Sequence, residues 1–433
     1  MKFHLPFKKR PVISAVERLI PPPIRTPNRL ESVPTEVRQC LMCVSDLGTL
    51  RALVLASPQY AQQFSRDREP ILLESLRSSL GVVLSDAYVV YLSSQAAFHQ
   101  ARTRESVTRF LAVNHRGVEG PEIWKIDEPL TLPVAMNMVR FHYKVIIPLT
   151  QRYVAWAFEN LYHRTGKISP PSRTEELRLM RAFYRFQLCC NLFGAGQHLP
   201  PGGSYFTFIA SDIIAMFLYN YHPWEVEELI CIYAYAVENY EVLFGRLPWE
   251  LSPHNPNFTG HPGTTFDLHD PVIKYDLIKS TASRGLHLLV AVTREHLDDA
   301  ELLTIIQENV AKRIGGFLDA ESLTLANLRA RTNQRRKVLW WLDSLCFKED
   351  RLFNPKRPTD LYPPFAWPLL WKGSPSNLYG YCIPPDLRRW GYIFWDRERM
   401  VQSRAERRLH QQWEAMWKGK EPREEYGICY ATA

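Results

Sequence analysis

Two carboxylates, Glu225 and Glu228, have a spacing that could support general acid–base chemistry. They stand one helical turn apart, so a helix would place them on one face, where one could donate a proton and the other accept one. Pro223 precedes them and suits the first turn of a helix. Glutamates in a first turn are stabilised by the positive end of the helix dipole. We therefore interpret the pair as part of a helix start and not as a catalytic pair.

A second cluster of polar side chains contains residue types that bind zinc. It occupies the segment 251–271, which is rich in His, Pro, Gly and Asn, and its candidate ligands are His254, His261, Asp267, His269 and Asp270. Imidazole and carboxylate groups coordinate zinc, but the spacings here match no compact ligand motif. We interpret the segment as a long polar loop, and we expect no metal and no cofactor.

Other catalytic motifs are missing from the sequence. The glycines at 194–196 and 201–203 are too sparse for a phosphate-binding loop and lack the Lys-Ser/Thr pair that such a loop carries. No Gly-x-Ser-x-Gly nucleophile elbow occurs. The sequence therefore predicts a protein that is not an enzyme.

The densest run of basic residues precedes two tryptophans, a combination that could hold a nucleic-acid strand through phosphate contacts and base stacking. The run comprises Arg329, Arg331, Arg335, Arg336 and Lys337, and it is followed by Trp340 and Trp341. The whole chain has 53 Lys and Arg against 45 Asp and Glu, a net charge of +8, and its acids and bases mostly alternate. We therefore favour a solvated basic helix face, and nucleic-acid binding is the third of three hypotheses.

The composition is typical of a folded protein of the cytoplasm or nucleus. The 433 residues are 46% hydrophobic and 12% aromatic, which is enough for a sizeable core. The first residues show no secretory signal, and no apolar run reaches the roughly 18–20 residues that a membrane span needs. We expect no membrane partner, and we expect the eight cysteines to be reduced and buried.

Helical patterns cover most of the chain. The clearest runs from 174 to 193: Ser172 and Glu175 form a capping-box pattern before it, and Gly194 follows it. Two of its three faces are apolar, which is typical of a core helix, and the third carries Arg178, Arg181 and Arg185. Further helices are predicted at 69–80, 86–98, 223–240, 272–295, 297–318, 321–347 and 395–417, with a proline-rich wrap at 351–393. No series of strands is evident, so the predicted class is all-α.

Residues 30–75 predict three short helices. Pro34 suits the first position of the first helix, whose apolar face holds Val37, Cys40, Leu41 and Val44. Asp46 can cap the second helix, which contains Leu47, Leu50 and Leu53. Ser57 and Pro58 can begin the third.

This segment resembles an F-box, the adaptor-binding motif of receptors in cullin-RING ubiquitin ligases. The residues that carry the resemblance are Pro34, Glu36, Val37, Leu41, Asp46, Leu47, Leu50 and Leu53. It implies that Pro34, Val37, Leu41, Leu47, Leu50 and Leu53 bind a Skp-type adaptor by helix-in-groove docking. The usual Leu before the proline is Val33 here, and the third helix begins Ser57-Pro58-Gln59-Tyr60 in place of a Cys-Arg-x-Trp-like run.

A wider resemblance spans most of the chain. It is similar to a group of uncharacterised filamentous-fungal proteins with an F-box-like start and a helical body, on the segments 53–60, 181–187, 223–228 and 389–397. That group implies a fold but no substrate or activity.

The predicted organisation is a basic, proline-rich tail (1–29), an F-box-like helical module (30–75), a large irregular helical domain (76–350), and a proline- and aromatic-rich wrap with a C-terminal amphipathic helix (351–433). We expect a non-catalytic substrate receptor that tethers an unknown client to an SCF-type ligase. The alternative is a helical scaffold protein whose N-terminal helices pack inside the molecule.

Overall fold

The computed structural model describes residues 30–100, 102–114, 126, 129–162, 169–195, 208–247, 249, 251–252, 254–255, 268–294, 297–310, 317–318, 353–354, 357–361, 363–371 and 383–418. The predicted tail 1–29, the predicted helix 321–347 and its basic run lie outside these residues. The chain divides into two compact units, Met1–Ser79 and Leu80–Ala433.

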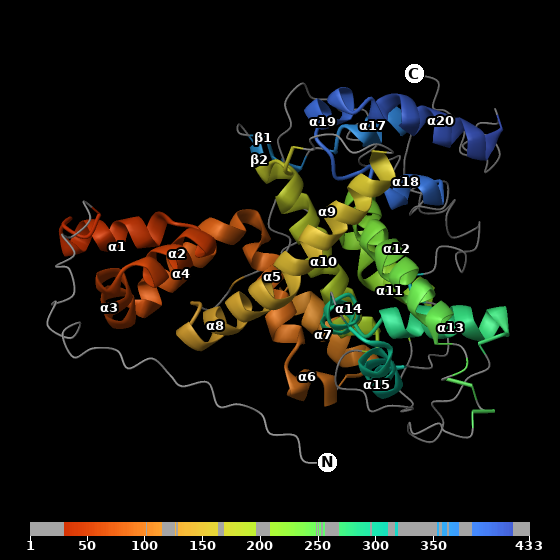
Figure 1. The fold of residues 1–433 in the computed structure, drawn as a ribbon, viewed down its shortest axis with the longest axis horizontal. Coiled ribbons are helices and arrows are strands. Elements are labelled where there is room, and N and C mark those ends of the chain that lie inside the picture. Colours follow the sequence, from red (N-terminus) through yellow and green to blue (C-terminus); the bar gives the residue numbers. More distant parts are fainter. Residues whose placement is uncertain are drawn as a thin grey trace, which may run out of the picture. The chain divides into compact units, whose positions relative to one another are not determined.

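The all-α prediction is confirmed (Figure 1). The first helices are α1 (Thr35–Val44), α2 (Leu47–Ala56), α3 (Pro58–Arg66) and α4 (Arg68–Leu80), and the second unit continues with α5 (Leu84–Ser93), α6 (Ala96–Gln100), α7 (Arg104–Asn114), α8 (Leu132–Phe141), α9 (Ile147–Leu161), α10 (Arg173–Phe193), α11 (Ala210–Met216), α12 (Pro223–Arg246), α13 (Pro271–Ala282), α14 (Leu286–Val292), α15 (Asp299–Asn309), α17 (Ala366–Trp371), α18 (Pro385–Arg389), α19 (Arg397–Gln402) and α20 (Ala405–Trp417). One antiparallel pair of short strands, β1 (Phe353–Asn354) and β2 (Arg357–Leu361), lies in the segment predicted to be irregular.

The N-terminal unit has a small core of its own. Met42, Leu50, Tyr60 and Ile71 pack together, one from each of α1 to α4, with half-buried apolar side chains around them. Asp46 caps α2 as expected, because its Oδ1 accepts a 2.9 Å hydrogen bond from the Thr49 N–H. The first helix begins one residue later than predicted, at Thr35, and Pro34 stands just before it.

The second unit is organised around α10 and α12, which pack against each other (Figure 1). The predicted capping box begins α10: the Glu175 N–H donates to Ser172 Oγ at 3.1 Å, and the Ser172 N–H donates to Glu175 Oε2 at 2.9 Å. Most side chains of α10 are buried, including those of Arg178, Arg181 and Arg185. This helix is therefore central, as its apolar faces predicted.

The arginines of α10 form buried ion pairs with acids from distant parts of the chain. Arg185 donates to Glu225 Oε1 at 2.5 Å and to Asp86 Oδ1 at 3.0 Å. Arg181 donates to both carboxylate oxygens of Glu228, at 2.9 and 3.1 Å. An unpaired charge at such a depth would cost several kcal/mol, so each arginine needs its acid.

The C-terminal segment is attached to the same helices by the same kind of contact. Arg178 donates to Asp396 Oδ1 at 2.6 Å. Arg399 makes a two-pronged contact with Glu175, at 2.9 and 2.8 Å, and Arg388 makes one with Glu227 of α12, at 2.8 and 3.0 Å. Paired N–H donors of this kind fix orientation as well as distance. Residues 388–399 are thus bound against α10 and α12.

Three long predicted helices are each broken in the structure. The 86–98 pattern divides into α5 and α6, with the break after Ser93. The 272–295 pattern divides into α13 and α14 at Gly285, whose φ of +95° is incompatible with a continuous helix. The 395–417 pattern divides into α19 and α20 at Arg404, whose φ is +56°. Apolar periodicity continues across each break, so periodicity alone missed it.

The thiols only partly match the prediction. Cys189, Cys190 and Cys231 are buried, as expected, whereas Cys40 is exposed and Cys43 half-buried. Among the helices that the structure describes, none is long and apolar enough to cross a membrane.

Replacing Arg185 with Met should destabilise the second unit strongly, because the buried carboxyl groups of Asp86 and Glu225 would both lose their main partner. We expect the free energy of unfolding to fall by about 3–5 kcal/mol. Denaturant unfolding followed by tryptophan fluorescence measures it, since all tryptophans of the chain lie beyond Ser79. Arg389→Gln is the control: its pair with Glu238 is exposed and should contribute at most about 1 kcal/mol. Equal losses in the two variants would contradict the assigned role.

The contribution of Glu225 should depend on pH. Burial by itself would raise the pKa of this carboxyl, but the guanidinium groups of Arg185 and Arg181 outweigh burial and lower the pKa to about 2, from an ordinary 4.5. Its stabilisation is therefore complete above pH 4.5 and is lost as the pH falls towards about 2. The difference in unfolding free energy between the wild type and Glu225→Gln should narrow on acidification below pH 4.5. A difference that is constant with pH would contradict this.

Candidate functional site

The structure places Glu225 and Glu228 in the ion-pair network of the core. Both are 1% exposed or less, and neither lines the pocket described below. The predicted helix-start role is present, because the His222 N–H donates to Glu225 Oε2 at 2.9 Å. The helix dipole was nevertheless an incomplete explanation, since the arginines of α10 are the main partners of both carboxylates.

The histidine-rich loop is only partly described. His261 and Asp267 lie outside the described residues, as do the basic run and the two tryptophans after it. Asp270 caps α13, with its Oδ1 accepting from the Val272 N–H at 2.8 Å. Within the described residues, no three His, Cys, Asp or Glu side chains are grouped as a metal site would require.

The six residues expected to bind an adaptor have different environments. Pro34 is exposed, and Val37 is 45% exposed. Leu41 and Leu53 are half-buried, the latter against the core of the unit. Leu47 and Leu50 are 5% and 3% exposed. These last two belong to the interior of the unit, and only the other four can present surface to a partner.

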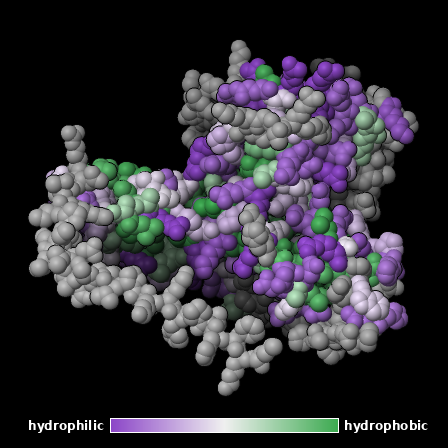
Figure 2. Space-filling model, in the orientation of Figure 1, coloured by the Kyte–Doolittle hydropathy of each residue, from purple (hydrophilic) through white to green (hydrophobic). Residues whose placement is uncertain are grey.

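Pro34, just before α1, and four side chains of α1 form an apolar stripe, which we call the α1 stripe: Pro34, Val37, Cys40, Leu41 and Val44. All are exposed except Leu41, which is half-buried. Val37, Leu41 and Val44 follow one another at intervals of four and three residues, so they share one helix face. Val44 is 72% exposed. Figure 2 shows hydrophobic side chains on the surface of the N-terminal helices.

Polar contacts hold the opposite face of α1 against α3. Arg38 Nε donates to Gln63 Oε1 at 3.0 Å, and Gln63 Nε2 donates to the Thr35 carbonyl at 2.7 Å. Arg38 also donates to the Val33 carbonyl at 2.8 Å, and the Tyr60 hydroxyl donates to the Leu30 carbonyl at 3.1 Å. These bonds fix the rotation of α1, and so they determine which of its faces is exposed.

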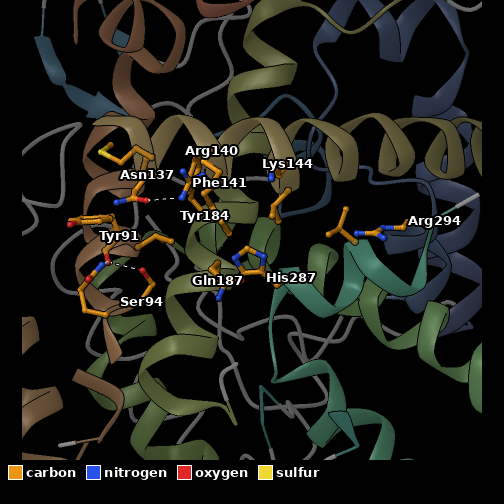
Figure 3. A pocket seen from close by; sticks show the side chains of 16 residues that line it. Tyr91, Ser94, Asn137, Arg140, Phe141, Lys144, Tyr184, Gln187, His287 and Arg294 are labelled. Carbon is orange, nitrogen blue, oxygen red and sulfur yellow. Dashed lines mark hydrogen bonds between the residues drawn. The ribbon is translucent and has the colours of Figure 1, made fainter. Parts of the chain in front are cut away.

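The second unit contains a pocket of about 520 Å³ whose walls come from separate segments. On one side are Tyr91 and its neighbours from α5 and the residues after it, and on another are Asn137, Arg140 and Lys144 from the helix that begins with α8. Tyr184 and Gln187 of α10 and the α14 segment complete the lining (Figure 3). Figure 3 shows Tyr91 and Ser94 at one end, Arg294 at the other and His287 between them.

The α14 wall is held at both of its ends. At its start, Gln187 Oε1 accepts from the Leu286 N–H at 2.7 Å. At its end, Arg152 of α9 donates to Thr293 Oγ1 at 2.9 Å and to the Val290 carbonyl at 3.3 Å. The pocket therefore has a fixed shape on this side.

A π-helical turn, η3 (His142–Ile146), lies in the wall opposite. It joins α8 to α9, and the Ile147 N–H bonds to the His142 carbonyl five residues back. Pro148 follows, and it has no N–H that could donate the usual helix hydrogen bond to the carbonyl four residues back. The extra residue in the turn shifts Lys144 and Val145 relative to a regular helix, and both line the pocket. Turns of this type occur often at functional sites.

Two histidines near the pocket are neutral at pH 7. Burial, with a smaller effect of Arg173, lowers the pKa of His142 to about 4, and its Nδ1 is 3.1 Å from the Tyr184 hydroxyl. Burial also lowers the pKa of His287, whose ring meets that of Phe141 edge-on at 5.3 Å. The positive charges at the pocket are therefore those of Arg140, Lys144 and Arg294.

Sequence reasoning missed this pocket, although one signal was present. Residues 129–158 contain no Asp or Glu, yet they include Arg140, Lys144 and Arg152. A long stretch without acids differs from the alternating charges elsewhere in the chain. The remaining lining residues come from distant segments, and only the fold brings them together.

No protein-family model, curated protein or solved structure matches this chain. The resemblances to F-box proteins and to filamentous-fungal proteins therefore stay predictions.

Replacing Gly285 with Ala should disturb the α14 wall. An added Cβ would lie 2.8 Å from both amide atoms of Gln187, at a φ of +95° that side chains disfavour. We expect a loss of more than about 1 kcal/mol in unfolding free energy, measured by tryptophan fluorescence in denaturant. Gly245→Ala in α12 is the control: nothing lies within 4 Å of its added Cβ, and it should gain about 0.5–1 kcal/mol. A neutral Gly285→Ala would contradict this account of the wall.

Proposed function

We propose that the N-terminal unit is an F-box-like docking module that binds a Skp-type adaptor, and that the protein is a non-catalytic receptor of a cullin-RING ubiquitin ligase. The exposed α1 stripe is the observation that carries the proposal. In this role the chain needs no nucleophile of its own, because other subunits of the ligase would carry out the ubiquitin transfer.

The burial pattern of the unit supports the proposal. Its core of Met42, Leu50, Tyr60 and Ile71 is built from its own helices, so the unit does not require the α1 stripe for folding. The side chains of Val37 and Val44 are exposed to solvent, by 45% and 72%. Aligned apolar side chains in water are typical of a face that a partner covers.

The form of the stripe suits helix-in-groove docking. Anchors at intervals of three and four residues along one helix are the pattern that an apolar groove accepts. The Arg38–Gln63 contacts on the opposite face keep α1 in one orientation, which reduces the ordering cost of binding. Leu47 and Leu50 act in this proposal by supporting the helices from inside, and Pro34, Val37, Leu41 and Leu53 present the surface.

The helical second unit would then carry the client. Co-purification with the full-length protein would identify the client, and binding of the adaptor can be tested before that.

Val37→Lys should weaken adaptor binding at least roughly tenfold, because a charge would have to be buried in an apolar contact. Its folding stability should not change, since Val37 is exposed. The measurement is titration of the full-length protein with a purified Skp-type adaptor. Val242→Lys is the matched control, because Val242 is also exposed, at 61%, but lies on α12.

A wild-type chain that does not bind the adaptor would contradict the proposal and favour the helical scaffold. Unchanged binding by both Val37→Lys and the double variant Pro34→Ala with Leu41→Ala would show that an adaptor, if bound, uses another surface.

A further inference from the structure

The pocket of the second unit has an unbalanced charge. Sixteen of the described residues line it, and these include Arg140, Lys144 and Arg294 but no Asp or Glu. Within the described residues, none of these three cations forms an ion pair. A hollow lined by charges of one sign focuses the potential and attracts counter-ions.

The cations enclose the hollow from two sides. Arg140 and Lys144 stand one turn apart on the wall that contains the π-helical turn, and Arg294 follows α14 on the other side (Figure 3). His287 lies between them and carries a neutral imidazole that can donate one hydrogen bond. A negatively charged group near the centre could thus be reached from both walls.

The rest of the lining is apolar or aromatic. Val90, Met138, Phe141 and Val145 contribute aliphatic and aromatic surface, and Tyr91 adds a ring with a polar tip. Tyr184 and Gln187 close the base, since they are 1% and 3% exposed. A volume of about 520 Å³ with apolar walls and few polar groups is typical of small-molecule sites.

We propose that this pocket binds a small organic anion in which a phosphate or carboxylate group is joined to a planar apolar part. The anionic group lies between Arg140, Lys144 and Arg294, and the planar part lies against Phe141 and Tyr91. This function is additional to adaptor docking: every lining residue belongs to the second unit.

The experiment is calorimetric titration of the full-length protein with four probes: 1-naphthyl phosphate, 1-naphthoate, uncharged 1-naphthol and inorganic phosphate. We expect saturable binding of at least one naphthyl anion, and none of naphthol under the same conditions. Stronger binding of the phosphate ester identifies a phosphate ligand, and stronger binding of naphthoate identifies a carboxylate ligand.

The double variant Arg140→Gln with Lys144→Gln should weaken that binding at least about tenfold, as expected for lost charge-assisted hydrogen bonds. Both side chains are exposed, so the protein should remain folded. Arg407→Gln is the matched control: it removes one exposed positive charge from α20 and should leave binding unchanged.

A second variant separates the pocket from general surface charge. Asn137 is an exposed lining residue, and Asn137→Trp would fill the hollow without altering any charge. It should abolish binding of the naphthyl anion. Binding as in the wild type would overturn the proposal, as would the absence of binding by both naphthyl anions. Inorganic phosphate that binds as tightly as naphthyl phosphate would overturn the assigned apolar subsite.

Discussion

The arginines of α10 need buried acids, and this need connects the parts of the second unit. A guanidinium without a partner in the core would cost several kcal/mol. The acids come from α5, from the first two turns of α12 and from the C-terminal segment, which are separated by up to about three hundred residues of chain. Because burying any of these charges without its partner would cost free energy, the segments are expected to assemble together. The network thus gives the large helical unit a single arrangement.

The same network supports the pocket. Asp86 and Arg185 form an ion pair, and their chain neighbours Ala87 and Tyr184 line the hollow. The buried ion pair is thus joined through the chain to two residues of the pocket lining. The π-helical turn and the two hydrogen-bonded ends of α14 position the three cations, and the described residues that line the pocket include no Asp or Glu. Balanced charges serve the core, and unbalanced charges line the surface that a ligand can reach.

The N-terminal unit follows a different principle. Its core consists of one apolar side chain from each of four helices, and its polar contacts fix the orientation of α1. A small core of this kind leaves apolar surface uncovered, and the α1 stripe is that surface. The two units thus present different surfaces: the apolar α1 stripe on the first and a pocket lined by three cations on the second.

The sequence by itself determined the local structure. The capping box of α10 and the cap at Asp46 follow from contacts within a few residues, and the helical class and the central place of α10 follow from the spacing of apolar residues. The helix breaks at Gly285 and Arg404 were not predicted from the sequence, because apolar periodicity continues across them. Tertiary structure alone decided which polar residues pair: the arginines of α10 find acids far along the chain, and Leu47 turns inwards while Val37 stays in water. Burial and charge pairing are properties of neighbours in space, and no spacing in the sequence encodes them directly.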